Sequence, residues 1–155
     1  MSKKRKISYV LIAIVMLIQL VRPSKNTGDA KGLNSIATNV EVDKILNTAC
    51  YDCHSNHTEY PWYCNIQPIG WWTSHHVNEG KEELNFSEFN SYSLKRKLKK
   101  LKEIKEQLDE NEMPLSSYTL IHSDAKLSAE NKIILIKWID DTKNNLVDTI
   151  PHQNL

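Results

Sequence analysis

Two thiols and an imidazole stand together at Cys50, Cys53 and His54, in the pattern C-x-x-C-H. Two cysteines so spaced on one irregular helical turn place both thiols where they can add to the two vinyl groups of one porphyrin. The adjacent imidazole of His54 then lies under the iron as its proximal ligand. Because this pattern is the attachment signature of c-type haem, we predict one covalent haem c held by these three residues.

Zinc binding is the other chemistry that this motif permits, because further ligand types follow it closely at His57, Cys64, His75 and His76. A structural zinc site usually has a second paired half, C-x-x-C or H-x3-5-H, and none follows here. The sequence therefore favours haem over zinc. For the odd cysteine, Cys64, we predict a buried or partly buried free thiol.

A second axial ligand for the iron has two candidates, Met113 and His76. Met113 precedes Pro114 in a turn-like region between two predicted helices, and we predict it as the distal ligand. His76 is the alternative, because it falls on the inward face of a predicted helix while His75 falls about 100° away. An open distal position would instead leave His76 or His75 to act as an acid or base.

Helices must position these groups. The apolar spacing of Val42, Ile45, Leu46 and Ala49 predicts a helix that ends at Cys50. A second helix is predicted from residue 65 or 67 to Glu79, closed by Gly80 as its left-handed cap. The aromatic side chains around its start are predicted either to wall the porphyrin or to fill the core; they are Tyr60, Trp62, Tyr63, Trp71 and Trp72.

The later part of the chain predicts two more helices. Ser93 is placed to cap a long helix whose leucines repeat at helical spacing, and Ser87 is a further candidate cap. Ser128 caps a terminal helix over residues 127–139. The long helix carries a basic face for which we predict an acidic redox partner or a merely solvated role; the face consists of Lys95, Arg96, Lys97, Lys99, Lys100, Lys102 and Lys105.

The first 22 residues differ in composition from the rest of the chain. Four cationic residues at positions 3–6 precede an apolar run over residues 7–21. The run would span about 22 Å against the roughly 30 Å of a bilayer core, but no small-residue cleavage site closely follows it. We therefore predict an uncleaved signal anchor, a single transmembrane helix over residues 1–22. The positive charge before it predicts an inner-membrane protein with its haem domain in the periplasm.

Composition and length limit the remaining classes. The 155 residues carry 20 Lys and Arg against 19 Asp and Glu, so bulk charge gives no reason to expect a nucleic-acid partner. Residues 23–39 have little apolar periodicity, which predicts a flexible tether between the anchor and the rest. A haem-binding domain is then predicted over residues 40–146, followed by a C-terminal tail over residues 147–155.

Several blocks occurring together resemble the bacterial haem-binding domain family of small, usually membrane-anchored proteins. These blocks are C-x-x-C-H, the segment Y-P-W-Y at residues 60–63, the run HVNEGKEELNFS at residues 76–87, and the late Met113-Pro114. Cys64 departs from the small neutral residue more usual in that family. The order of motifs is also similar to class I cytochromes c, and this resemblance supports Met113 as the distal ligand.

These observations together predict a mainly α-helical fold, a small cytochrome c-like domain around one haem. One-electron transfer at the periplasmic face of the membrane is the favoured function. Two alternatives stay open: a peroxidase-like haem enzyme with an open distal site, and a haem-based sensor that couples ligand binding to a partner. Iron coordination separates them, because an electron carrier needs both axial positions filled.

Overall fold

The computed structural model describes residues 2–149, and all of the regular structure in that range is helical. The mainly α-helical fold class is therefore confirmed. Seven α-helices lie in this range: α1 (Lys3–Ile18), α2 (Val40–Ala49), α3 (Tyr51–His54), α4 (Ile69–Glu83), α5 (Leu94–Asp109), α6 (Ser116–Thr119) and α7 (Ala129–Asp148). Short 3-10 turns are η1 (Trp62–Asn65), η2 (Phe86–Ser91) and η3 (Ser123–Ala125).

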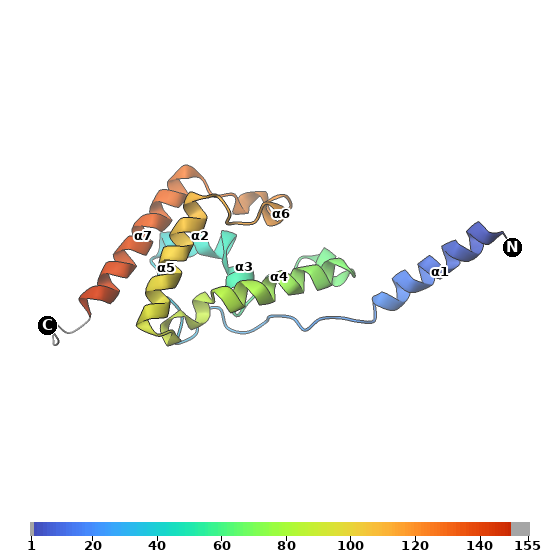
Figure 1. The fold of residues 1–155 in the computed structure, drawn as a ribbon, viewed down its shortest axis with the longest axis horizontal. Coiled ribbons are helices and arrows are strands. Elements are labelled where there is room, and N and C mark those ends of the chain that lie inside the picture. Colours follow the sequence, from blue (N-terminus) through green and yellow to red (C-terminus); the bar gives the residue numbers. More distant parts are fainter. Residues whose placement is uncertain (1, 150–155) are drawn as a thin grey trace.

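One hydrophobic core joins α2, α5 and α7, which pack together at one end of the molecule (Figure 1). Each helix contributes a fully buried aliphatic side chain, Leu46 from α2, Leu101 from α5 and Leu135 from α7. Phe89 of η2 is buried among them. Burying apolar area of this kind is the main favourable term in folding, so these helices form the frame on which the remaining elements are placed.

Capping residues define both ends of α5. The Ser93 hydroxyl accepts a hydrogen bond from the Arg96 amide at 3.4 Å, which confirms the predicted cap. At the other end Asn111 adopts a left-handed conformation with φ 60°. The Glu112 amide then donates to the Gln107 carbonyl at 3.0 Å, as in the Schellman helix ending. This ending turns the chain sharply, and the next residue is Met113.

The terminal helix is longer than the sequence predicts. Ser128 caps α7 as expected, accepting from the Asn131 amide at 3.0 Å. The helix then continues to Asp148 rather than ending near residue 139, since the polar residues after Ile139 still suit a helix with an exposed face. The predicted tail over 147–155 thus begins inside the helix, and residues 150–155 lie outside the described range.

Two other local predictions are wrong. Gly80 does not close α4, because the helix continues to Glu83 and its C-cap is Leu84. Ser87 lies inside the turn η2, whose cap is Asn85, with a side chain that accepts from the Ser87 amide. Gly80 does not adopt a left-handed conformation. It lies where α4 passes close to the Cys53 backbone.

Residues 23–39 differ from the predicted tether. They form no helix, but hydrogen bonds fix them along the domain surface. The Asn26 side chain donates to the Ser55 carbonyl at 3.0 Å, and the Ile36 amide donates to the Phe86 carbonyl at 2.9 Å. The Ile36 side chain is buried in the core. This segment is therefore a strap bound to the domain, which we call the 23–39 strap.

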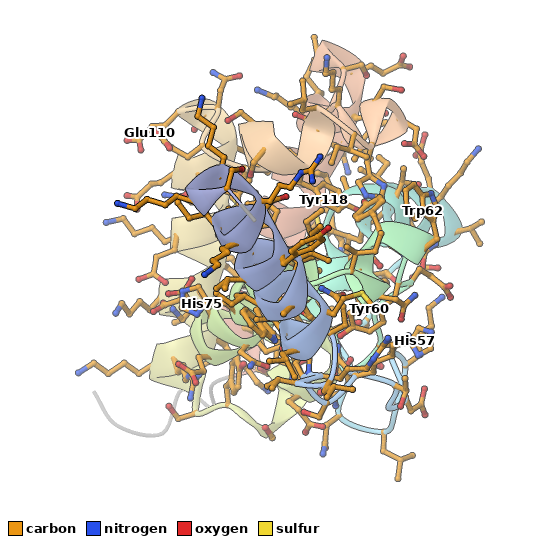
Figure 2. All side chains as sticks on the ribbon, turned by 90° about the vertical axis from the view of Figure 1, so that its right-hand side faces the viewer. His57, Tyr60, Trp62, His75, Glu110 and Tyr118 are labelled. Carbon is orange, nitrogen blue, oxygen red and sulfur yellow. The ribbon has the colours of Figure 1, made fainter. Side chains whose placement is uncertain are left out.

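α1 stands apart from the core, and Figure 1 shows it projecting away from the other helices. Its apolar side chains are exposed all round, as seen end-on in Figure 2. Just after α1, hydrogen bonds join the chain to α4 and to the residues before it. Gln19 and Gln67 exchange two hydrogen bonds, and the Trp71 indole donates to the Val21 carbonyl at 2.7 Å. Over residues 2–149, no helix combines the length and apolar character needed to cross a bilayer, so the transmembrane helix predicted over 1–22 is not supported.

Candidate functional site

The C-x-x-C-H motif forms its own short helix directly after α2. Val42, Ile45, Leu46 and Ala49 are all buried, which confirms the predicted apolar face of α2. The chain breaks from helical geometry at Cys50, where φ is −131°, and then α3 begins. The Cys50 carbonyl accepts from the amides of Cys53 and His54 at 3.2 and 3.0 Å. The three motif residues therefore occupy one irregular turn whose start is fixed in the core.

Backbone carbonyls at the end of α4 orient the His54 ring. Its Nδ1 lies 2.9 Å from the Gly80 carbonyl oxygen and 3.0 Å from the Leu84 carbonyl oxygen. Carbonyl oxygens only accept, so Nδ1 must carry the proton and donate. In a neutral imidazole this leaves Nε2 with a free lone pair, which is the form that binds a metal.

Burial keeps the three motif side chains neutral. It lowers the pKa of His54, an effect that the hydrogen bonds to Leu84 and Gly80 only partly oppose. Burial and the neighbouring Cys53 raise the pKa of Cys50 to about 12, while burial and the Asp52 charge raise the pKa of Cys53 to about 11. Neutral thiols suit conversion to uncharged thioethers, whereas zinc would need thiolates in the same apolar surroundings.

The zinc alternative also lacks a ligand set. Across residues 2–149, no three His, Cys, Asp or Glu side chains come together in a way that would hold a metal ion. Cys64 is a buried free thiol, as predicted, and its Sγ lies 3.6 Å from the Thr73 hydroxyl. His57 lies on the surface, where Nε2 faces Glu59 at 3.2 Å. The ligand types near the motif are thus dispersed.

An apolar cavity of about 420 Å³ lies beside the motif, between the core helices. Cys50, His54 and Met113 all line it. The other lining side chains are largely apolar and come from α2, α5 and α7, with Phe86 of η2; they include Leu46, Leu108, Leu135 and Trp138. Ligand cavities in proteins usually measure about 300 to 1,000 Å³, and the flat apolar faces of a porphyrin need such a lining.

A second cavity of about 480 Å³ adjoins the first and shares Cys50, His54 and Met113 with it. Cys53 and His76 line only this second cavity. Both thiols, the proximal imidazole and the predicted distal thioether therefore lie on one continuous pair of cavities. The residues present fit a haem, which Cys50, Cys53 and His54 would hold.

The two histidines of α4 differ in placement, as predicted. The His75 side chain is 66% exposed, whereas that of His76 is 29% exposed. The His76 ring packs edge-on against Trp72, with ring centroids 4.4 Å apart, and its Nδ1 lies 3.8 Å from a Glu79 carboxylate oxygen. His76 thus lies at the second cavity and stays a competitor to Met113.

The aromatic side chains near the start of α4 do not wall the porphyrin site. Tyr60, Trp62, Tyr63, Trp71 and Trp72 are absent from the lining of both cavities. Trp62 is 75% exposed and lies at the margin of the domain (Figure 2). The aromatic lining comes instead from Phe86 and Trp138 in the first cavity and from Tyr118 in the second.

Sequence reasoning missed an ion-pair cluster at the first cavity. Lys100 lines this cavity, although its side chain is only 11% exposed, and its Nζ lies 2.7 Å from Glu103 and 3.2 Å from Glu83. Burial lowers the pKa of Lys100, but its bonds to the two carboxylates outweigh that effect and raise it overall. The i, i+3 spacing of Lys100 and Glu103 was the available signal.

Several cationic side chains of the basic face predicted on α5 form ion pairs with acidic side chains of the same chain. Lys99 pairs with Glu103, Lys102 with Glu106, and Lys105 with Asp140. Arg96 lies over the Tyr92 ring, 4.0 Å from its centroid. Four of the seven cationic side chains are therefore paired with carboxylates, and within residues 2–149 no ion pair involves Lys95, Arg96 or Lys97.

Comparison with known proteins gives the family. The family model for a haem-binding domain matches residues 13–141, which is more than half of the chain. The chain therefore belongs to the haem-binding domain family, and this membership supports haem as its cofactor. Neither the curated proteins nor the solved structures contain a match.

Gly80 provides the first test of this geometry. A Cβ on Gly80 would lie 2.7 Å from the Cys53 carbonyl oxygen and 3.1 Å from the Cys53 Cβ. Gly to Ala inside a helix normally stabilises by about 1 kcal/mol. Here we expect Gly80→Ala to destabilise the protein by about 1 to 3 kcal/mol, because two backbones must separate. Denaturant unfolding of the full chain measures this change.

Gly32→Ala is the matched control. A Cβ there would meet only a flexible Asp29 carboxylate oxygen, at 3.7 Å, so its effect should stay within about 0.5 kcal/mol. A Gly80→Ala protein as stable as the parent would show that α3 and α4 do not approach each other as described.

Proposed function

We propose that the chain binds one haem c covalently and transfers single electrons. The observation that carries this proposal is the combination, on one pair of cavities, of two neutral thiols with an imidazole whose Nδ1 is already bonded. Cys50 and Cys53 would form the thioethers, and the haem iron would supply the redox chemistry. The residues of the chain hold the group, fix the His54 tautomer and exclude water from its apolar faces.

Covalent attachment is tested on the full chain made in a bacterium that attaches haem c. We expect a mass increase of one haem and a haem absorbance that survives denaturation, both lost when Cys50 and Cys53 are replaced by alanine. Cys64→Ala is the control, because its thiol is buried away from both cavities. Chelators that release zinc from a protein without any haem absorbance would contradict the proposal.

Met113 is the distal ligand in this proposal. It lines both cavities with His54, on the loop between the end of α5 and α6. A methionine thioether stabilises ferrous over ferric iron relative to a second histidine, and so raises the reduction potential. With both axial positions filled, the iron has no site for a substrate, which favours electron transfer over catalysis.

Paired substitutions test the ligand. Met113→Ala should abolish the long-wavelength charge-transfer band of ferric methionine-ligated haem and lower the potential, while His76→Ala should leave both nearly unchanged. Met16→Ala in exposed α1 is the control for loss of a methionine. If His76→Ala makes the iron high-spin and Met113→Ala has no effect, the ligand is His76.

One observation favours a second function, a peroxidase-like haem enzyme. His76 lies at the second cavity beside Glu79, an arrangement in which an imidazole can move a proton. That function needs an open distal position. Wild-type ferric protein that is high-spin and reacts with peroxide would support the enzyme, whereas high-spin iron that binds small gases without turnover would support a sensor.

We also propose that residues 1–22 attach the chain to the bacterial inner membrane, with the haem domain in the periplasm. The support is that α1 begins with four cationic residues and then exposes apolar side chains around the rest of the helix. An apolar surface of this kind is rare on a protein that stays in water.

Cell fractionation tests this attachment. The full chain should sediment with membranes, require detergent for release, keep its first 22 residues, and be cut by protease added outside the inner membrane. Lys100→Met is the control. Lys100 is paired with Glu103 inside the domain, so this substitution should not change the amount of protein in the membrane fraction. A mature protein that begins near Lys31 and needs no detergent would contradict it.

A further inference from the structure

The loop that carries Met113 is tied to the haem motif itself. Tyr118, in α6, donates its phenol hydrogen bond to an Asp52 carboxylate oxygen at 2.7 Å. Asp52 lies between Cys50 and Cys53, so this bond joins the two parts of the site that are far apart in sequence. A bond from a neutral donor to a charged acceptor is among the stronger ones that proteins form.

Both partners of this bond are themselves fixed. The second carboxylate oxygen of Asp52 accepts from the Glu59 amide at 2.9 Å. The Tyr118 ring stacks on His122, with centroids 4.3 Å apart and planes 13° from parallel. His122 Nε2 lies in turn 2.7 Å from the Tyr63 hydroxyl. These contacts hold the Tyr118 ring and the Asp52 carboxylate in the orientation in which they form their hydrogen bond.

Tyr118 stays a donor under physiological conditions. Burial and its hydrogen bond with Asp52 raise the pKa of the phenol well above its usual range. The phenol therefore keeps its proton and remains the donor in this bond.

The two ends of the loop are held by different means. At its start, the Glu112 amide and the Met113 amide both reach the Gln107 carbonyl, at 3.0 and 3.4 Å. At its end stands the bond between Tyr118 and Asp52. Met113 and Pro114 line both cavities between these two points. Loss of the bond to Asp52 removes this tie between α6 and the haem motif, while the stack of the Tyr118 ring on His122 remains.

We propose that Tyr118 is a positioning residue, whose hydrogen bond to Asp52 closes the loop and holds Met113 over the haem. This rests on the proposed function, because it needs haem attached at Cys50 and Cys53. Tyr118 lines the second cavity but is not proposed as a ligand of the iron. It acts through Met113, so its removal should matter only while Met113 is present.

Cyanide binding to the ferric full chain tests the proposal, because an external ligand enters only when the loop lets Met113 leave. Tyr118→Phe should raise the cyanide association rate about tenfold, as expected when a hydrogen bond to a charged acceptor is lost. Asp52→Asn keeps an acceptor without the charge and should give a smaller increase. In a Met113→Ala background, Tyr118→Phe should add nothing.

Tyr60→Phe is the matched control, since the Tyr60 hydroxyl accepts from the Asn26 amide and does not touch the loop. Its rate should match that of the wild type. A wild-type rate in Tyr118→Phe, or an equal increase in Tyr60→Phe, overturns the proposal while leaving haem attachment intact. A protein without covalent haem overturns the proposed function and this proposal together, and the absorbance spectrum separates the two cases.

Discussion

The orientation of His54 is the constraint on which the site depends. A histidine placed after two cysteines is free to rotate, and either ring nitrogen can then face the cofactor. Here the Gly80 and Leu84 carbonyls, from the last turn of α4 and its cap, both accept from Nδ1. This fixes the proton on Nδ1, and Nε2 keeps the lone pair that a metal would use. The Gly80 carbonyl accepts from Nδ1 in addition to the Leu84 amide, which donates to it at 2.9 Å, because a carbonyl oxygen has two lone pairs.

The rest of the packing serves this contact. α4 reaches the motif only because Gly80 has no side chain where the helix passes the Cys53 backbone. α2 holds the start of the motif through its buried face, and the Schellman ending of α5 directs Met113 toward the same cavities. The 23–39 strap closes the outside of the motif, where Asn26 bonds to the Ser55 carbonyl. Three segments distant in the sequence, which are α4, the end of α5 and the 23–39 strap, thus meet around the motif, and α2 leads directly into it.

Side-chain patterns predicted much of this arrangement from the sequence. The C-x-x-C-H motif, the helix before it, the caps at Ser93 and Ser128, and the inward placement of His76 all follow from spacing and residue type. Contacts made by backbone groups were not predictable in this way. The carbonyl partners of His54 have no residue signature, and a glycine such as Gly80 serves equally well for a cap or for close approach. The strap was missed because polar residues that bond to a neighbouring surface have the same composition as a free linker.

A crystal structure of the haem-loaded full chain tests the central claim most directly. We expect iron bound to His54 Nε2, with Nδ1 still bonded to the Gly80 and Leu84 carbonyls and with thioether bonds at Cys50 and Cys53. A His54 ring turned so that Nδ1 binds the metal, or a haem seated away from the two cavities, would contradict it.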